Sequence, residues 1–535
     1  MKQYKPVLLV ILDGFGVPQD RVGSPWEIIK RPNFSEIEQN FPFTTLQASG
    51  IAVGLPWGKE GNSEVGHLNI GAGKIILNYL PRITNSIEDG TFFANKAFAR
   101  AIEHVTKNGS RASLHLMGLF SSGTVHAYAE HLYSLLDLAK RNNLKKVFLH
   151  LFTDGKDAYQ KEGYSFYKKM EERLAEQYPN AKIVSVIGRK YAMDRDNNWD
   201  RTKKAYKLFT EGEGNSFRTP SEYIKSQYEK EIFDAAIEAA AIEGGEGRIR
   251  DNDAVIFYNF REDSPRQLTH AFVDREFNKF ERRKLKNLVF VTMTEYDKKI
   301  SSSPEEKETD GRIFPAFKSA AVEYPLARVV SEAGLKQLHI AESEKYAHVT
   351  FFINGGEEKP FEREDRILVP SPEVSSYDLA PEMSADKVTE TVISNLKKYD
   401  LIIVNFANAD MVGHTGNLEA TARAIKKIDE CIGKILPEIL KAGGVMAITA
   451  DHGNAEEKIY KTTGEKKSMH SSNPVPFYVV AKEFKRDKPL TKEEVDELYK
   501  KVRGTLTDVA PTILALLGLK KPIMMTGKNL LEKIT

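Results

Sequence analysis

The sequence contains little cysteine, no long hydrophobic run and almost no net charge. Its single cysteine, Cys431, excludes an internal disulfide bond and fits a reducing compartment. The apolar run nearest the N-terminus, Val7–Leu12, stops at Asp13 and is too short for a signal peptide or a membrane span. Lys and Arg total 77 against 75 Asp and Glu, so a net charge of +2 gives no case for nucleic acid or an anionic membrane as a partner. We therefore expect a cytoplasmic protein.

What the sequence does contain is typical of a soluble α/β protein. With 535 residues, of which 41% are hydrophobic and 28% charged, the chain is too long for one core, and two domains are expected. Short apolar runs alternate with helical stretches such as Ala420–Leu440, which predicts buried, largely parallel strands. The runs are Val7–Leu12, Val147–Phe152, Ile183–Ile187, Ala254–Phe260, Leu288–Thr292, His348–Ile353, Leu401–Phe406, Val445–Thr449 and Pro476–Val480.

Polar residues follow many of these runs and fall into two chemical groups. In parallel sheets the ligand site lies beyond the carboxyl ends of the strands. The N-terminal segment and the C-terminal part carry Asp, His and Ser, whereas the middle carries His126, Asp157 and several arginines. This indicates a discontinuous domain, residues 1–78 and 322–535, with a second domain inserted at residues 79–321.

The first group has the composition of a two-metal site. Its candidate ligands are Asp13, Asp410, His414, Asp451, His452 and His470. Asp410 and His414 share one face if their segment is helical, because residues i and i+4 are neighbours. Carboxylate with imidazole suits Mn, Zn or Fe better than Ca or Mg. Any one of these residues alone is more simply explained as a hydrogen-bonded polar side chain at a strand end, so the indication comes from the whole set.

Ser63 is the candidate nucleophile. It follows a Gly- and Pro-rich loop and precedes a helical segment, so it could also be an ordinary helix N-cap. The two interpretations are compatible, because the positive potential at a helix N-terminus favours a phosphate anion. A nearby metal would lower the pKa of the hydroxyl. Together with the metal set, Ser63 indicates phosphoryl transfer.

Arginines dominate the second group. Their planar forks suit phosphate and carboxylate, although surface ion pairing with nearby aspartates is the alternative for each one taken alone. The candidates are Arg189, Arg195, Arg261 and Arg266, with Asp194, Asp196 and Asp263 in the same segments. His67 and Cys431 are interpreted as structural.

Motifs in order along nearly the whole chain resemble one family. They are Leu-Asp13-Gly-Phe-Gly, Gly-Asn-Ser63-Glu-Val-Gly-His-Leu-Asn-Ile-Gly-Ala-Gly, Ser-Ser-Gly-Thr-Val-His126, Thr-Asp-Gly-Lys-Asp157, Gly188-Arg189, Tyr-Ala-Met-Asp-Arg195-Asp, Asn-Phe-Arg261, Glu-Lys345-Tyr-Ala-His-Val-Thr-Phe-Phe, Asn-Ala-Asp410-Met-Val-Gly-His414-Thr-Gly, Thr-Ala-Asp451-His452-Gly-Asn and His470-Ser-Ser-Asn-Pro-Val-Pro. The sequence resembles the cofactor-independent phosphoglycerate mutases of the alkaline phosphatase superfamily.

The resemblance implies two α/β domains, one a discontinuous alkaline-phosphatase-like metal domain and the other an inserted substrate-binding (transferase) domain. It implies interconversion of 3-phosphoglycerate and 2-phosphoglycerate in glycolysis and gluconeogenesis, by a monomer with two divalent ions, most often Mn²⁺, and no 2,3-bisphosphoglycerate. Ser63 would carry the phosphate, and Asp157 would act as acid and base. The implied ligand sets are Asp13, Ser63, Asp451 and His452 for one metal, and Asp410, His414 and His470 for the other. The implied substrate-binding residues are His126, Arg189, Arg195, Arg261 and Lys345.

The sequence departs from the family pattern on the substrate side. Lys156 stands where the family usually has an arginine, which keeps the charge but loses the fork. Ser264 stands where the family has a second arginine, and we hypothesise that Arg266 reaches the same phosphate instead. Lys156 and Arg266 are therefore counted among the substrate-binding candidates. Residues 211–250 also match the family poorly.

Two other functions remain open from the sequence. One is a metal-dependent phosphatase, or another mutase of the same superfamily, acting on a different small phosphorylated substrate. The serine motif and the substrate set of the middle domain argue against it. The other is a metal-stabilised binding protein without activity, which predicts loss of the nucleophile or of ligands, whereas all the expected positions are present.

Overall fold

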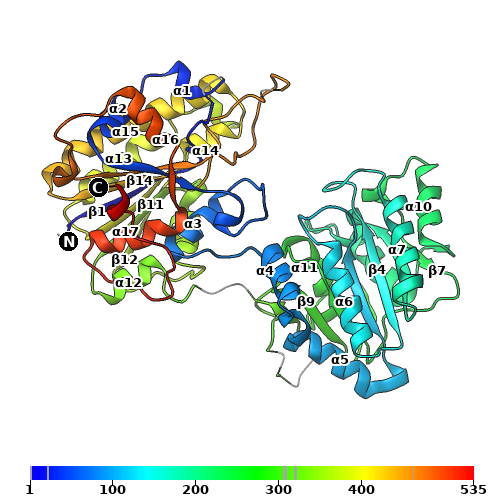
Figure 1. The fold of residues 1–535 in the computed structure, drawn as a ribbon. Coiled ribbons are helices and arrows are strands. Elements are labelled where there is room, and N and C mark those ends of the chain that lie inside the picture. Colours follow the sequence, from blue (N-terminus) through cyan, green and yellow to red (C-terminus); the bar gives the residue numbers. More distant parts are fainter. Residues whose placement is uncertain are drawn as a thin grey trace. The chain divides into compact units, whose positions relative to one another are not determined.

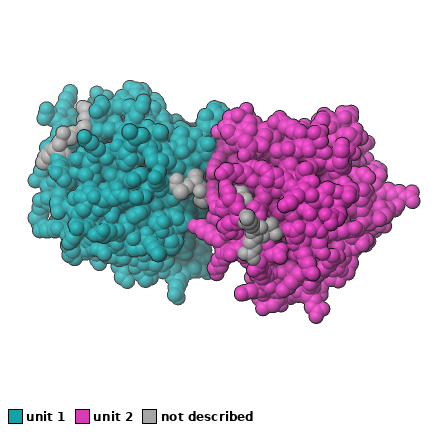
Figure 2. All heavy atoms as spheres, turned by 90° about the horizontal axis from the view of Figure 1, so that it is seen from below, with its two compact units in different colours: residues 1–78, 320–535 teal, residues 79–319 magenta. Residues whose placement is uncertain are grey.

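The structure is a computed structural model of the 535-residue chain, and it describes residues 3–20, 23–303, 305–306, 310–318, 322–460 and 462–534. The chain divides into two units, each with its own sheet and core (Figures 1 and 2). Unit 1 comprises Met1–Asn78 and Ala320–Thr535, and unit 2 comprises Tyr79–Ser319. The second domain boundary expected from the sequence falls beside residues 319–321, which lie outside the described residues.

Unit 1 contains an eight-stranded sheet in the order β12-β11-β13-β1-β14-β15-β2-β16. The five strands from β12 to β14 are parallel, whereas β15 runs antiparallel to both β14 and β2. The strands are β1 (Val7–Leu12), β2 (Phe43–Gln47), β11 (Gln337–Glu342), β12 (Glu364–Val369), β13 (Leu401–Phe406), β14 (Val445–Thr449), β15 (Val475–Val480) and β16 (Val502–Thr505).

Helices cover both sides of this sheet (Figure 1). Their amphipathic faces supply the apolar side chains that exclude water from the strands. They are α1 (Pro25–Ile28), α2 (Pro32–Asn40), α3 (Ser63–Ala72), α12 (Leu326–Glu332), α13 (Ala385–Asn395), α14 (Asn408–Gly413), α15 (Leu418–Lys441), α16 (Lys492–Tyr499), α17 (Val509–Leu516) and α18 (Leu531–Ile534).

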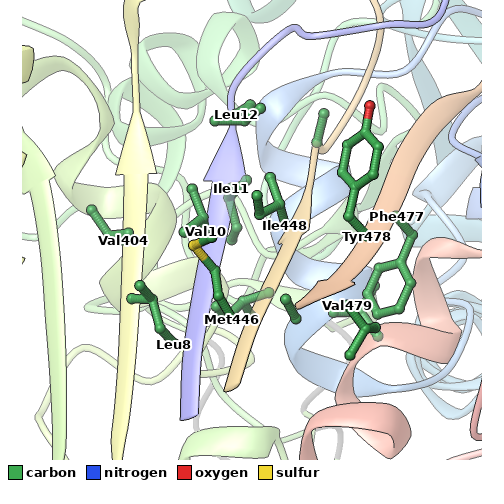
Figure 3. Packing of buried hydrophobic residues seen from close by; sticks show 14 of the residues in the cluster. Leu8, Val10, Ile11, Leu12, Val404, Met446, Ile448, Phe477, Tyr478 and Val479 are labelled. Carbon is green, nitrogen blue, oxygen red and sulfur yellow. The ribbon is translucent and has the colours of Figure 1, made fainter. Parts of the chain in front are cut away.

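The central strand β1 is the most enclosed part of unit 1. Every residue from Val7 to Leu12 is fully buried, which a strand with neighbours on both edges and helices on both faces requires. Figure 3 shows side chains of β1 packed with Val404 of β13, Ile448 of β14 and Tyr478 of β15. This packing fixes the positions at which the neighbouring strands end.

Unit 2 contains a second eight-stranded sheet, in the order β10-β9-β8-β3-β4-β5-β7-β6. All its pairings are parallel except that of β7 with β5. The strands are β3 (Leu114–Leu119), β4 (Val147–Thr153), β5 (Ala181–Gly188), β6 (Asn215–Phe217), β7 (Ala240–Ile242), β8 (Ala254–Phe257), β9 (Val289–Thr294) and β10 (Phe314–Phe317). The helices are α4 (Tyr79–Glu88), α5 (Lys96–Asn108), α6 (Ala129–Arg141), α7 (Gly163–Gln177), α8 (Arg189–Ala192), α9 (Trp199–Glu211), α10 (Pro220–Tyr228) and α11 (Asp263–Val273).

One expected strand is wrong. The apolar run His348–Ile353 forms a π-helix at His348–Phe352 rather than a strand. This segment packs on helix α3 and strand β11, and Val349 accepts a hydrogen bond from the buried His339, 2.6 Å from its carbonyl oxygen. Tertiary packing has therefore overridden the β propensity of the run.

Among the helices that the structure describes, none is both long enough and apolar enough to span a membrane.

Candidate active site

The acidic and imidazole side chains of unit 1 come from one edge of its sheet. Because β13, β1 and β14 are neighbouring parallel strands, their carboxyl ends meet there. Asp13 follows β1, Asp410 lies in helix α14 after β13, and Asp451 and His452 follow β14. The antiparallel β15 begins at the same edge, and the loop before it supplies His470.

Ser63 is the first residue of helix α3 and not its cap. Asn62 is the N-cap, and its side chain accepts a hydrogen bond from the backbone of Val65 at 2.9 Å. The Ser63 hydroxyl donates to Asp13 Oδ1 at 3.0 Å and lies 3.0 Å from His452 Nε2. The helix can approach this closely because Gly66 has no side chain: a Cβ there would lie 2.5 Å from the Asp451 carbonyl oxygen.

Lys345 lies among these groups. It is 4% exposed, and its ammonium donates to Ser63 Oγ at 2.8 Å and to Asp410 Oδ2 at 2.7 Å, while Asp13 Oδ1 is also 2.7 Å away. Burial disfavours its charge, but the coulombic attraction of the surrounding carboxylates outweighs burial and raises the pKa of Lys345. The resemblance gave Lys345 a substrate-binding role, whereas here it contacts the nucleophile and two candidate metal ligands.

Three histidines have the orientation that metal ligands require. His414, His452 and His470 each place Nδ1 against a backbone carbonyl oxygen, at 3.1, 3.2 and 2.7 Å. A carbonyl can only accept, so Nδ1 carries the proton and the lone pair of the neutral ring is on Nε2. The Nε2 atoms of His414 and His470 lie 3.1 Å apart, and each is 3.4 Å from Asp410 Oδ1. The Nε2 lone pairs of His414 and His470 therefore face each other beside the Asp410 carboxylate, an arrangement that fits one cation bound by all three.

The buried carboxylates give the same indication. Asp13, Asp410 and Asp451 are at most 2% exposed, and Asp451 Oδ2 has no hydrogen-bond partner among the described residues. Although burial opposes the charged form, the Lys345 ammonium holds the pKa of Asp13 and Asp410 far below their usual range. Burial also disfavours charge on His452, but the coulombic effect of Asp451 and the other acids outweighs it and raises the pKa of His452 to about 10. The acids that favour this proton would also favour a divalent cation in its place, with mixed oxygen and nitrogen ligands.

The predicted substrate residues of unit 2 also gather at one sheet edge. The strands β8, β3, β4 and β5 are consecutive parallel neighbours. Each carboxyl end leads into part of the set: His126 after β3, Asp157 after β4, Arg189 after β5 and Arg261 after β8. The arrangement repeats that of unit 1 with arginine in place of imidazole.

Arg189 is held by two aspartates. One guanidinium nitrogen donates to Asp154 Oδ1 and to Asp157 Oδ2, both at 2.6 Å. Asp154 is buried and also accepts from the Ser121 hydroxyl at 2.7 Å and from the backbone of Lys156 and Asp157 at 3.0 Å. Because Asp154 is buried and held by these hydrogen bonds, it fixes the direction of Arg189.

A second cluster surrounds Asp263, the first residue of helix α11. Asp263 Oδ2 accepts hydrogen bonds from Arg195 and, at 3.2 Å, from Arg261. His126 lies between the clusters, with Nε2 3.8 Å from Asp157 and Nδ1 3.8 Å from Asp263. Burial, and then the Arg189 charge, lower the pKa of His126 to about 4.

The two residues that differ from the family pattern, Lys156 and Ser264, differ in burial. The Lys156 side chain is exposed. Ser264 is buried and bonds to Asp263. Arg266 lies further along α11, exposed, and its Nε donates to the Tyr296 carbonyl oxygen at 2.7 Å.

Comparisons with known proteins agree with this geometry. A model of the metalloenzyme superfamily matches residues 5–521. The 2,3-bisphosphoglycerate-independent phosphoglycerate mutase of Moorella thermoacetica is 45% identical, over 99% of this chain and 99% of its own length. The enzyme of that name from Clostridium perfringens (strain 13 / Type A) is 46% identical over the same shares. The chain belongs to this mutase family. A crystal structure of Leishmania mexicana phosphoglycerate mutase at low cobalt concentration aligns with a TM-score of 0.65 and 26% identity, covering 98% of this chain and 97% of that one.

Family membership confirms the resemblance, the α/β fold class and the assignment to a family of isomerases that are metalloenzymes. Three residues near the candidate metal ligands were not singled out from the sequence. Asn454 donates to Asp410 Oδ1 at 2.7 Å, and its own backbone donates to the buried Glu456 at 2.9 Å. Lys458 donates to the Gly413 carbonyl oxygen at 2.8 Å. The only signal was their position directly after Asp451 and His452.

Proposed function

We propose that the protein interconverts 3-phosphoglycerate and 2-phosphoglycerate through a phosphoserine at Ser63, without 2,3-bisphosphoglycerate. The observation that carries this proposal is the environment of the Ser63 hydroxyl, which contacts Asp13, His452 and Lys345 at 2.8–3.0 Å. An ordinary helix-start serine has no need of a buried ammonium and two candidate metal ligands. The names of the relatives supply the substrate class.

In the proposed reaction, Ser63 Oγ attacks the phosphorus of the bound substrate and displaces the glycerate oxygen. The phosphorus–oxygen bond to glycerate breaks as the bond to Ser63 forms. Ser63 loses its hydroxyl proton and the released glycerate alkoxide takes one up, so the transfer consumes no net proton. The reverse transfer to the other hydroxyl completes the isomerisation. Lys345 favours this attack because its ammonium donates to Oγ and stabilises negative charge there. The N-terminus of α3 adds positive potential at the same atom.

Two divalent ions, with Mn²⁺ the expected species, would be held by the unit 1 residues. The proposed sets are Asp13, Ser63, Asp451 and His452 for one ion and Asp410, His414 and His470 for the other. When bound, such ions lower the pKa of a coordinated hydroxyl and neutralise charge on a phosphoryl group. The orientation of the three imidazoles and the unpartnered Asp451 Oδ2 support these sets.

Unit 2 is the proposed substrate-binding domain, and unit 1 the proposed metal and transfer domain. The forks of Arg189, Arg195 and Arg261 suit the carboxylate and phosphate of phosphoglycerate. Asp157 is proposed to exchange the proton with the glycerate hydroxyls, because its Oδ2 lies at the junction of Arg189 and His126. The proposal also includes a monomeric, cytoplasmic enzyme of glycolysis and gluconeogenesis.

An enolase-coupled assay on 3-phosphoglycerate tests the proposal. EDTA-treated enzyme is assayed with added Mn²⁺ and no 2,3-bisphosphoglycerate, beside Ser63→Ala. We expect metal-dependent turnover that falls by at least about 10⁴-fold in the alanine variant, because the nucleophile is lost. Release of inorganic phosphate without 2-phosphoglycerate would establish a phosphatase instead. Turnover retained by Ser63→Ala would overturn the phosphoserine.

A further inference from the structure

Behind the candidate ligands of unit 1, a buried hydrogen-bonded pair connects three of them. Asn405, in strand β13, donates from Nδ2 to Asp13 Oδ2 at 2.8 Å and to His67 Nε2 at 3.0 Å. His67, in helix α3, places Nδ1 2.8 Å from the Ser63 carbonyl oxygen and 3.2 Å from Asp451 Oδ2. Both side chains are fully buried.

The orientation of Asn405 follows from its partner. A carboxylate oxygen offers only lone pairs, so the amide nitrogen, not the amide oxygen, must face Asp13. That nitrogen carries two hydrogens, one for Asp13 and one for His67. His67 Nε2 is therefore an acceptor, and the ring carries its proton on Nδ1.

The other side of the ring gives the same tautomer independently. The Ser63 carbonyl oxygen can only accept, so His67 Nδ1 must donate. With its Nδ1 proton donated and its Nε2 lone pair occupied, His67 has no free nitrogen lone pair for a metal. This holds even though His67, Asp13 and Asp451 lie close enough together to resemble a ligand set.

We infer that His67 and Asn405 are positioning residues for the proposed metal set of Asp13, Ser63 and Asp451, and are not ligands themselves. The pair fixes one oxygen of Asp13, the backbone at the nucleophile, and the place of Asp451 Oδ2, which stays available to a cation. Partners of this kind orient ligands, and their loss typically costs 10- to 100-fold in metal affinity or activity. The inference rests on the proposed pair of metal ions.

The test is a Mn²⁺ titration of EDTA-treated protein followed by electron paramagnetic resonance, which counts free ions without any turnover. Wild type should bind two ions. His67→Leu and Asn405→Leu should each lower the affinity for one ion by about 10- to 100-fold. The affinity for the other ion should be unchanged, because Asp410, His414 and His470 do not contact the pair. The double variant should be no worse than the worse single one, since both substitutions break one connected unit.

His339→Leu is the matched control. His339 is equally buried in the same unit, and it bonds to the Val349 carbonyl oxygen at 2.6 Å and to Gln337 Oε1 at 3.2 Å, but it does not contact a candidate ligand. It should lower the melting temperature and leave both ions at wild-type affinity. If His67→Leu and Asn405→Leu behave like this control, the positioning role is wrong.

Conservative variants keep the test decisive if the leucine proteins do not fold. His67→Asn retains a donor near the Nδ1 position and loses the acceptor for Asn405. His67→Gln retains an acceptor near Nε2 and loses the bond to Ser63. Each should bind one ion more weakly than wild type and the other ion with unchanged affinity, and full wild-type affinity in both would overturn the inference. Failure of the underlying function is distinguishable, because wild type would then bind fewer than two ions.

Discussion

The two units build their sites at the same place on the same kind of sheet and fill them with opposite chemistry. In unit 1, three buried aspartates meet a lysine and three imidazoles whose lone pairs converge. In unit 2, Asp154, Asp157 and Asp263 each pair with arginine, and several of these side chains are partly exposed. Unit 2 therefore holds its guanidinium groups in place with aspartates, whereas unit 1 has a surplus of lone pairs that suits cations.

The largest effect is expected from removing the Lys345 ammonium beside Ser63. Lys345→Met keeps much of the length of the side chain and deletes its charge beside Ser63 Oγ, Asp13 and Asp410. We expect kcat at saturating Mn²⁺ to fall by about 10²- to 10³-fold, because charge stabilisation at the nucleophile is lost.

The same variant should bind Mn²⁺ at least as tightly as wild type, since a competing cation is gone. Steady-state kinetics and a metal titration measure the two effects separately. Loss of metal together with activity would mean that Lys345 organises the ligands and has no separate role in transfer.

Arg261 and Arg266 of unit 2 can be compared, because they lie close in sequence but have different hydrogen-bond partners. Arg261 belongs to the Asp263 cluster, whereas Arg266 bonds to the Tyr296 carbonyl oxygen. If Arg266 replaces the family arginine missing at Ser264, Arg266→Ala should lower kcat/KM by about 10- to 100-fold, as Arg261→Ala should, because each removes a charged hydrogen bond to the substrate.

Arg283→Ala, which removes a surface arginine paired with Asp251 at 3.2 Å, is the control and should leave the kinetics unchanged. Near-normal kinetics for Arg266→Ala alone would show that the phosphate is bound without a substitute at this position.

The smallest effect concerns a buried carboxyl of unit 1 that lies outside the metal set. Glu342 accepts from the Ser384 backbone at 3.0 Å, and burial raises its pKa to about 7. Between its ordinary pKa of 4.5 and about 7, the folded protein binds more protons than the unfolded one, so stability falls as pH rises.

Glu342→Gln should therefore be more stable than wild type at pH 8 by about 1–3 kcal/mol, with the difference shrinking toward pH 4.5. Urea denaturation at several pH values measures it. A difference that does not change with pH would assign the effect to packing alone.

The strands that carry the site were predictable because their sequences are short runs of mainly apolar residues. Val7–Leu12, Leu401–Phe406 and Val445–Thr449 are found as strands with these bounds. The strands β3 and β11, which contain His115 and His339, were not predicted. Both histidines are buried and hydrogen-bonded, His115 to Asp253 at 3.1 Å and His339 to the Val349 carbonyl oxygen at 2.6 Å.

The supporting residues could not be predicted for a related physical reason. Asn405 lies inside an expected apolar strand, and His67 lies inside a helix, so neither has a local pattern that indicates its partner. Their role depends on a hydrogen bond between two residues that lie 338 positions apart in the sequence. The motifs were enough to identify the candidate ligands. The hydrogen bonds that Asn405 and His67 make to them could be found only from the three-dimensional structure.

The position of β1 also has a consequence for how the protein is made. Unit 2 is one continuous segment, but the first strand of unit 1 lies between β13 and β14. The six side chains of this strand are fully buried in the finished fold. During synthesis, roughly 390 further residues must be added before the first neighbouring strand, β13, begins. At typical elongation rates of about 5–20 residues per second, the delay is on the order of 20–80 seconds. The apolar side chains of β1 therefore lack their final partners during this time, while unit 2, whose strands all lie in one continuous segment, can complete its sheet first.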